Sequence, residues 1–363
     1  MQVKSLKDAE VSGKRVLVRC DFDVPLDNSS GQATVKDDSR LRAALPTIGF
    51  LREHGAKEII LIGHLGRPDG VVVEELRVAP VVKKLAELID MQEVVVKENL
   101  RFDPREEAND PTLAQELASL ADIFINESFA TAHRAHASTV GVAKLLPSYA
   151  GLHLEEEVTK LSAALVPPPG AIALIGGAKF ETKQPLIEKL LATYSKVFIG
   201  GALGNDLIKA RGFPFGSSLI SSMPVPEAIA GNDRLFSPED AAFMGGSMDG
   251  RTSPVTDTRA DEHIVDLGPA TALAWAKEIE AAPFVLWNGP MGIYEQGYTH
   301  GTDTLAGALA GSNAQAIIGG GDTVAAVSKF TFDKEKIFIS SGGGAMLEFL
   351  VNGTLPALEV LKA

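Results

Sequence analysis

Short apolar runs alternate with amphipathic stretches along nearly the whole chain. Consecutive apolar, β-branched residues are typical of strands buried on both faces, and apolar residues every three or four positions are typical of helices. This alternation predicts parallel sheets covered by helices, an α/β fold. The predicted strands are residues 15–20, 58–62, 93–97, 122–126, 171–175, 196–200, 283–287, 314–318 and 336–340. Between them the first half has helical patterns such as residues 39–54, ended by Gly55, and 79–89.

One charged amphipathic stretch separates two such halves. Residues 152–166 are predicted to form a helix, and the following Pro167-Pro168-Pro169-Gly170 cannot continue it. A chain of 363 residues also exceeds what one hydrophobic core usually organises. We therefore expect two doubly wound, Rossmann-like domains, residues 1–151 and 170–349, joined by residues 152–169. Residues 217–261 are rich in Gly, Ser, Pro and Asp, and we expect one short strand there, near Leu235.

The charge balance and the single cysteine narrow the classes of function. A formal net charge of −13 argues against nucleic acid or an anionic membrane as partner, because both need a large basic surface. Cys20 alone excludes an intramolecular disulfide and a thiolate zinc site. The first residues lack the apolar core of a signal peptide, and no apolar run approaches membrane-spanning length. These features lead us to expect a cytoplasmic protein.

Polar side chains follow the predicted strands of the first half. Because the carboxyl ends of parallel strands meet at one edge, these residues should lie close together. They are Asp21, Phe22 and Asp23, then His64, Leu65, Gly66 and Arg67, then Arg101, then Arg134, with Arg40 beginning the first helix. Guanidinium groups bind carboxylates and phosphates in a bidentate way and stay charged. The cluster therefore suits a small ligand that carries both a phosphate and a carboxylate.

Two pairs within this cluster have alternative interpretations. His133 and His136, three residues apart, are a possible metal pair, but no third ligand lies nearby in sequence, and contact with substrate or support of the arginines is favoured. Asp21 and Asp23 are a possible acid/base pair. Their position beside arginines instead favours hydrogen bonding to a ligand hydroxyl and orientation of the cluster.

Glycines take the place of arginines at the strand ends of the second half. Each group precedes a predicted helix: Gly176-Gly177, Gly200-Gly201, Gly319-Gly320-Gly321 and Gly342-Gly343-Gly344. Glycine lets backbone N–H groups approach phosphate oxygens, and a helix N-terminus attracts anions, so these loops predict a nucleotide-phosphate cradle. Lys179 and Lys183 can reach the transferring oxygens, and Asp322 is a natural partner for magnesium.

Neither common nucleotide signature occurs in the chain. There is no G-x-x-x-x-G-K-[ST] and no G-x-G-x-x-G opening a first βαβ unit. This absence disfavours a nicotinamide-dependent dehydrogenase. A non-catalytic nucleotide- or phosphate-binding protein on the same fold is a second alternative, but such a protein would be expected to lose Arg40, Lys179, Lys183 or Asp322, and all are present.

The chain resembles the phosphoglycerate kinase family over almost its whole length. The resemblance rests on eight segments in the family's order: RVLVRCDFDVP from Arg15, DDSRLRAALP from Asp37, HLGRP from His64, ENLRF from Glu98, TAHRAHAST from Thr131, GGAK from Gly176, WNGPMG from Trp287 and GGGDT from Gly319. Members of that family transfer a phosphoryl group between 1,3-bisphosphoglycerate and ADP, with magnesium.

The resemblance implies a role for each matching residue. In the first domain, 3-phosphoglycerate would be held by Asp21, Phe22, Asp23, Arg40, His64, Leu65, Gly66, Arg67, Arg101 and Arg134. In the second, the nucleotide would be held by Lys183, Gly200, Gly201, Glu295, Gly320, Gly321, Asp322 and Thr323, with Asp322 beside Mg²⁺. Arg40, Lys179, Lys183 and the helix beginning near Gly343 would act on the transferring group. The family further implies a monomer, a cleft site between the domains, and a tail, residues 350–363, that returns to the first domain.

Four departures from the family pattern stand out. Asp23 replaces an asparagine, and residues 126–134 read NESFATAHR where the family has NDAFGTAHR. Residues 200–207 read GGALGNDL where GGGMAYTF is common, which makes the contacts to the base less certain. The chain is also shorter between Gly216 and Asp266.

Overall fold

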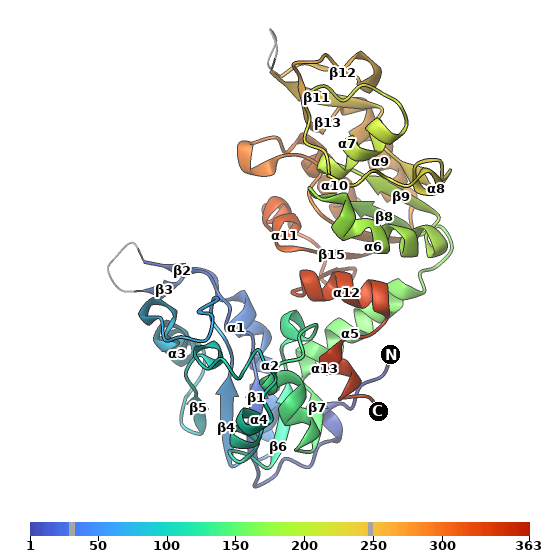
Figure 1. The fold of residues 1–363 in the computed structure, drawn as a ribbon. Helices are drawn as coiled ribbons and strands as arrows, with labels where there is room; N and C mark the ends of the chain where they lie inside the picture. The colour runs from blue at the N-terminus through green and yellow to red at the C-terminus, as the bar shows by residue number, and fades with distance from the viewer. Residues whose placement is uncertain (29–32, 246–249) are drawn as a thin grey trace. The chain divides into compact units, whose positions relative to one another are not determined.

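The computed structural model describes residues 1–28, 33–245 and 250–363 (Figure 1). The chain divides into two compact units, one of Met1–Thr159 with Asn352–Ala363 and one of Lys160–Val351. The division falls within helix α5 (Leu152–Leu165). The C-terminal residues are tied to the first unit, since the N–H of Lys4 donates to the carbonyl of Leu361 at 2.8 Å and that of Ala357 to Ala132 at 3.0 Å.

The first unit is built on a parallel sheet. Its strands are β1 (Arg15–Arg19), β4 (Glu58–Ile62), β5 (Val94–Val96), β6 (Ile123–Asn126) and β7 (Ser148–Ala150). Their spatial order is β5-β4-β1-β6-β7, so the direction of winding reverses between β1 and β6. Ligands bind at such a reversal in doubly wound sheets, beyond the carboxyl ends of the strands.

The second unit repeats this plan. Its parallel sheet consists of β8 (Ile172–Ile175), β9 (Lys196–Ile199), β10 (Leu235–Phe236), β14 (Phe284–Asn288), β15 (Gln315–Gly319) and β16 (Ile337–Ile339). The order is β10-β9-β8-β14-β15-β16, with the reversal between β8 and β14. An antiparallel sheet of order β12-β11-β13 is added, from β11 (Asp240–Met244), β12 (Thr252–Pro254) and β13 (His263–Leu267). A hairpin in the first unit pairs β2 (Leu26–Asp27) with β3 (Thr34–Val35).

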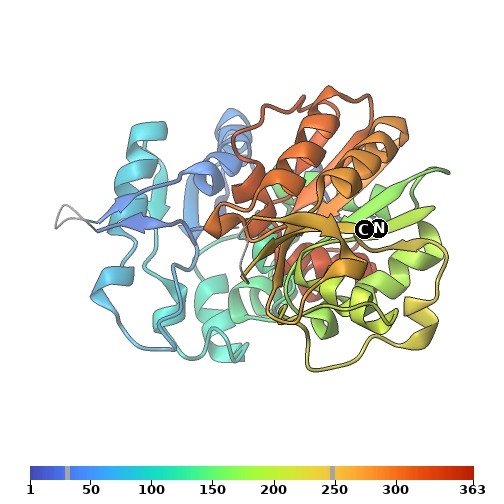
Figure 2. The same ribbon diagram turned by 90° about the horizontal axis from the view of Figure 1, so that it is seen from above.

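Helices cover both sheets. The first unit has α1 (Ser39–Ala43), α2 (Leu45–Glu53), α3 (Ala79–Leu88), α4 (Pro111–Ala118) and α13 (Pro356–Glu359). The second has α6 (Phe180–Thr193), α7 (Gly201–Ala210), α8 (Glu227–Ala230), α9 (Pro269–Ala281), α10 (His300–Gly311), α11 (Gly321–Val327) and α12 (Gly344–Asn352). In Figure 2, α9 and α10 lie on one face of the second sheet and α6 and α7 on the other. No helix within the described residues is both long and apolar enough to cross a membrane.

Buried strand residues form the cores on both sides of each sheet. In the first unit Val16 and Val18 pack with Ile59 and Leu61 against the helices of one face. In the second unit Trp287, fully buried on β14, packs with Trp275 of α9 and other apolar side chains of α9 and α10. Burial on both faces explains why these strands are continuously apolar in sequence.

The predicted α/β fold with two doubly wound parallel sheets is confirmed, and the nine predicted strands are present with small differences at their ends. The expected helix over residues 39–54 is two helices, α1 and α2, which meet at Ala44 just before Pro46. Pro46 has no N–H to donate to the carbonyl four residues earlier, so a continuous helix would lose a hydrogen bond there.

The prediction of a single strand within residues 217–261 was incomplete. The strand near Leu235 is confirmed as β10, but β11 and β12 also lie in this stretch. The sequence of β11, Asp-Ala-Ala-Phe-Met, has little β-propensity. It is a strand because it pairs antiparallel with β13 and buries Ala241 and Phe243. The predicted strands also omit β13, which follows this stretch, the two-residue strands β2 and β3, and β7, which is three residues long and too short for a periodic pattern.

A buried carboxyl group lies where β6 meets the start of α5. Glu127 is 2% exposed, and its Oε1 accepts a hydrogen bond from the N–H of His153 at 3.2 Å. A Cβ atom at Gly151 would lie 1.7 Å from its Oε2, so glycine is needed beside it. Burial raises the pKa of Glu127 to about 8. The carboxyl group is therefore mostly protonated at neutral pH in the folded protein.

This raised pKa predicts that the first unit loses stability as pH rises. Above the ordinary pKa of a glutamate, the folded state still holds this proton while the unfolded chain has released it. The contribution of Glu127 to the free energy of unfolding is therefore complete in acid and is lost as pH rises toward 8. We expect Glu127→Gln to flatten the fall in the free energy of unfolding between about pH 5 and 8, a difference on the order of a few kcal/mol. Urea unfolding at several pH values measures it. Glu156→Gln, an exposed change on α5, the helix whose start contacts Glu127, should leave the slope as in the wild type. Equal slopes for all three proteins would contradict the prediction.

Candidate active site

The polar residues predicted to gather at the edge of the first sheet lie together. Arg40, at the start of α1, donates to Oδ2 of Asp21 at 2.7 Å. The N–H of Gly66 donates to Oδ1 of Asp23 at 2.9 Å, and Arg101 donates to the carbonyl of Gly66 at 3.0 Å. The loops after β1, β4 and β5 are thus linked by their own polar groups. Asp21 and Asp23 thus accept hydrogen bonds from other members of the cluster. This geometry agrees with the orienting role that the sequence analysis favoured over an acid/base pair.

His64 is held in one tautomer by a buried arginine. Its Nδ1 lies 3.0 Å from an Nη of Arg19, and a guanidinium can only donate, so Nδ1 accepts and the proton is on Nε2. Burial, with the nearby charge of Arg19, lowers the pKa of His64 far below its usual value. His64 is therefore neutral at pH 7. Its Nε2 lies 3.8 Å from Oδ2 of Asp23.

Arg19 and its partners are residues that the sequence interpretation missed. Arg19 is 1% exposed, and its Nε donates to the hydroxyl of Ser138 at 3.0 Å. Ser138 in turn donates to the buried carboxylate of Glu106 at 2.5 Å. The signal in the sequence was an arginine inside an otherwise apolar strand, VLVRC. A charge in such a place needs a buried partner, which here lies far away in the chain.

The remaining predicted residues of the first unit differ in exposure. Arg67 and Arg134 are exposed, and within the described ranges no hydrogen bond or ion pair holds the guanidinium of Arg67. Phe22 and Leu65 are 1% and 2% exposed, so their side chains belong to the core and only their backbone atoms can face a ligand. His136 is also buried, which lowers its pKa to about 4. Among the described residues no group of three His, Cys, Asp or Glu side chains is arranged to hold a metal.

A cavity of about 380 Å³ marks the reversal of strand order in the second unit. It gathers the loops after β8, β14 and β15 and the start of α12. Its lining includes Lys179, Lys183, Gly320, Gly321, Asp322, Thr323 and Gly343. Helices α6, α11 and α12 begin directly after the glycine loops, as the sequence predicted. Backbone N–H groups and two lysines therefore share one cavity, an arrangement suited to phosphate groups.

Two glycines allow the loops on either side of this reversal to touch. A Cβ atom at Gly176 would lie 2.1 Å from the carbonyl oxygen of Pro290, and one at Gly289 would lie 2.3 Å from the backbone of Gly176. Gly289 also has φ +101°, a conformation that favours glycine. Any larger residue at either position would push the loops apart and change the cavity.

Lys183 is positioned by an asparagine that the sequence interpretation did not single out. Its Nζ donates to Oδ1 of Asn288, the last residue of β14, and the Nδ2 of Asn288 donates to the carbonyl of Gly319 at 2.9 Å. Thr323 donates to the same carbonyl at 2.9 Å and accepts from the N–H of Gly289 at 2.6 Å. The sequence clue to Asn288 was its place in the segment WNGPMG, where a polar residue ends a fully buried strand.

The other predicted nucleotide residues lie outside the lining of this cavity. Gly201 begins α7, and its N–H donates to the carbonyl of Met291 at 3.1 Å, while Gly200 precedes it. Glu295 is exposed, in a short 3₁₀ helix (Tyr294–Gln296). The hydroxyl of Tyr294 donates to Oδ1 of Asp322 at 3.4 Å. Asp322 itself does line the cavity and is exposed in the first turn of α11.

Comparison with known proteins gives the family. The sequence profile of the phosphoglycerate kinase family matches residues 6–353. The chain belongs to the phosphoglycerate kinase family. It is 42% identical over 398 residues to a phosphoglycerate kinase of Roseiflexus sp. (strain RS-1), with 100% of both chains covered, and 42% identical to that of Moorella thermoacetica, with 98% of both covered.

Solved structures of the family have the same fold. The phosphoglycerate kinase of Coxiella burnetii superposes with a TM-score of 0.87 at 34% identity, covering 99% of each chain. That of Pyrococcus horikoshii OT3 gives 0.82 at 28% identity, covering 99% of this chain and 98% of the other. The chain is thus a member of a phosphotransferase family, and neither the dehydrogenase nor the non-catalytic alternative is favoured.

The half-buried amine of Lys183 predicts that use of the nucleotide depends on pH. Burial lowers the pKa of Lys183 to about 8, although Asp322 opposes the shift. Only the ammonium form attracts phosphate, so kcat/KM for the nucleotide should fall about tenfold per pH unit above pH 8. Steady-state kinetics from about pH 6 to 10 measures the fall. Lys183→Arg should move this fall in kcat/KM to higher pH, because a guanidinium stays charged. The shift is expected whatever the maximal rate of the variant. A flat profile up to about pH 9.5 in the wild type would contradict the prediction.

Proposed function

We propose that this protein catalyses the reversible transfer of a phosphoryl group from 1,3-bisphosphoglycerate to ADP, giving 3-phosphoglycerate and ATP. The observation that carries the proposal is the cavity of the second unit, where two lysines, an aspartate and the N-termini of helices meet at the strand reversal. Membership of the phosphoglycerate kinase family supports the choice of substrates.

The first unit would bind 3-phosphoglycerate. Its ligand carries a phosphate and a carboxylate, and the edge of the first sheet offers permanently charged guanidinium groups to both. The residues assigned to this task are Asp21, Asp23, Arg40, His64, Arg67, Arg101 and Arg134, with the backbone of Phe22, Leu65 and Gly66. Neutral His64, protonated on Nε2, is a hydrogen-bond donor here without adding charge.

The second unit would bind the nucleotide. Lys179, Lys183 and the N–H groups of Gly320 to Thr323 would contact its phosphates, and Gly200, Gly201 and Glu295 would lie on the side of the nucleoside. Magnesium is usually held by one or two carboxylates together with the substrate's phosphates, and the single carboxylate of Asp322 in the cavity lining fits that pattern. Magnesium would neutralise phosphate charge there.

No general base is required for this reaction. In the direction of ATP consumption the nucleophile is a carboxylate, which is already ionised at pH 7 because its pKa is roughly 3 to 4. Catalysis then rests on in-line positioning and on groups that neutralise the charge of the transferring phosphoryl. Arg40 from one unit, and Lys179, Lys183 and the N–H groups at Gly343 from the other, are the residues assigned to that charge.

The two ligands would be carried by different units, so the units must close on each other for transfer. Reacting atoms need to be about 3 to 3.5 Å apart, and water that would hydrolyse the acyl phosphate must be excluded. We assign the bending to residues 150–151, 167–170 and 340–344. Small-angle scattering should show a smaller radius of gyration with both ligands than with either alone, and an unchanged radius would count against closure.

A coupled assay with ATP, magnesium and 3-phosphoglycerate tests the proposed reaction directly. We expect turnover that needs all three components. Activity with a nicotinamide cofactor, or nucleotide binding without turnover, would instead support one of the alternatives. A monomer suffices for the reaction, since one chain carries both groups of residues, and we place it in the cytoplasm, where ATP and ADP are available.

A further inference from the structure

The N-terminus of α6, which carries the two lysines of the cavity, has no cap of its own. Lys179 is the residue before the helix, and its side chain makes no capping hydrogen bond. Pro185 lies inside the helix and has no N–H, so the carbonyl of Glu181 loses its usual helical partner. The first turns of α6 are therefore weakly held by the helix itself.

A serine from a distant loop caps this helix instead. The N–H of Phe180, the first residue of α6, donates to the hydroxyl of Ser221 at 2.7 Å. Phe180 is 2% exposed, so its N–H has no access to bulk water as an alternative acceptor. Ser221 lies 41 residues further along the chain, in the loop that leads to α8.

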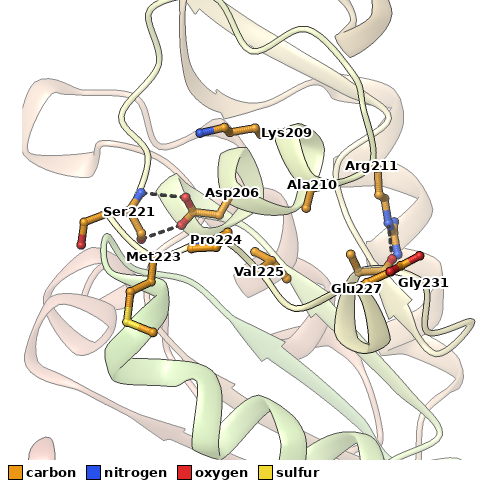
Figure 3. Close-up of a pocket in the computed structure, with 12 residues that line it drawn as sticks. Asp206, Lys209, Ala210, Arg211, Ser221, Met223, Pro224, Val225, Glu227 and Gly231 are labelled. Atoms are coloured by element: carbon orange, nitrogen blue, oxygen red, sulfur yellow. Dashed lines mark hydrogen bonds between the residues drawn. The ribbon is translucent and has the colours of Figure 1, made fainter.

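Asp206 of α7 fixes the direction of this serine. The hydroxyl of Ser221 donates to Oδ2 of Asp206 at 2.7 Å, and the N–H of Ser221 donates to Oδ1 at 2.7 Å (Figure 3). A hydroxyl has one proton, and because Asp206 accepts it, a lone pair remains for the N–H of Phe180. Asp206 is 5% exposed. Burial raises its pKa, and the two hydrogen bonds from Ser221 oppose that shift.

The Ser221 loop is also held by Asn205, the neighbour of Asp206 on α7, whose Nδ2 donates to the carbonyl of Leu219 at 3.0 Å. Asp206 and Ser221 line a cavity of about 540 Å³, and Met223 and Pro224 from the same loop line it too (Figure 3). Position 206 also falls in residues 200–207, where the chain departs from the family pattern.

We propose that Asp206 and Ser221 are positioning residues that fix the start of α6 and thereby place Lys179 and Lys183 against the nucleotide phosphates. The relay runs from the carboxylate of Asp206 through the hydroxyl of Ser221 to the N–H of Phe180, which directly follows Lys179. This inference rests on the proposed function for the identity of the ligand. Neither residue is part of the lining of the cavity that holds Lys179 and Lys183.

The test compares Ser221→Ala with the wild type in ADP binding and in turnover. We expect ADP affinity by calorimetry and kcat each to fall about tenfold, the effect of one lost hydrogen bond that orients a charged group. KM for 3-phosphoglycerate should stay unchanged, because that ligand is assigned to the other unit. Ser221→Thr, which keeps the hydroxyl, should restore both values. The double variant Asp206→Ala, Ser221→Ala should lower ADP affinity and kcat no more than Ser221→Ala alone, since both changes break the same relay.

Ser222→Ala is the matched control. Ser222 is the next residue, exposed and on the same cavity, and its change should leave affinity and rate as in the wild type. If Ser221→Ala does not fold, Ser221→Cys retains the size with a weaker hydrogen-bonding group and should give an intermediate loss. ADP affinity and kcat equal to the wild type in folded Ser221 variants would overturn the relay. A wild-type protein that binds ADP but shows no turnover would overturn the proposed function, while the ADP comparison would still test the relay.

Discussion

Replacing Arg40 with alanine should lower kcat about a thousandfold and leave the protein folded. Arginines that stabilise the transferring phosphoryl contribute on this scale in other phosphoryl transfers. Arg40 is held ready for such a role, since Asp21 fixes its guanidinium at 2.7 Å while 36% of the side chain stays exposed. Its removal should cost little in stability because the guanidinium is open to water, and ion pairs reached by solvent contribute little. Steady-state kinetics with saturating ATP and 3-phosphoglycerate measures the effect.

Arg42→Ala provides the matched control for Arg40→Ala. Arg42 lies on the same helix, is more exposed, and pairs with Asp38 four residues earlier, away from the Asp21 cluster. Its loss should leave kcat within about twofold. Arg40→Lys should recover only a small part of the activity, since an ammonium lacks the planar fork. Near-normal turnover of Arg40→Ala would remove Arg40 from the centre of the mechanism.

Replacing Gly289 with alanine should cause the largest loss of stability among single changes in the cavity. Alanine at φ +101° is strained by about 1 to 3 kcal/mol, and its Cβ would overlap the backbone of Gly176 at 2.3 Å, which adds an overpacking cost of similar size. We expect the free energy of unfolding of the second unit to fall by about 3 to 5 kcal/mol. Because the loops after β8 and β14 would separate, ADP affinity should fall as well.

Gly297→Ala is the control that separates the backbone strain at Gly289 from the steric overlap of its added Cβ atom. Gly297 has φ +87°, but a Cβ atom there would meet nothing within 4 Å. It should therefore show the conformational cost alone, about 1 to 3 kcal/mol, with ADP affinity unchanged. Urea unfolding and calorimetry on both variants give the comparison. Equal losses at the two positions would show that contact between the loops is unimportant.

Much of the candidate site was predictable because strand ends can be read from the sequence. A strand buried on both faces appears as a run of apolar residues, and the first polar residue marks its end. Asp21 after β1 and His64 after β4 were located in this way, and both lie at one edge of the sheet. The glycine groups before α6 and α11 were located by the same reasoning.

The sequence alone determined the α/β class, the positions of the buried strands and the residue types at their ends, because these follow from local periodicity and composition. Only the tertiary structure decided which distant residues meet. The partnership of Arg19 with His64, the contact of Gly289 with Gly176, and the relay from Asp206 through Ser221 to Phe180 all join separate segments. The strand β11 likewise exists because β13 pairs with it. The physical reason is that hydrogen bonds and steric contacts depend on distances in space, which strand order and register set, and local sequence patterns do not contain them.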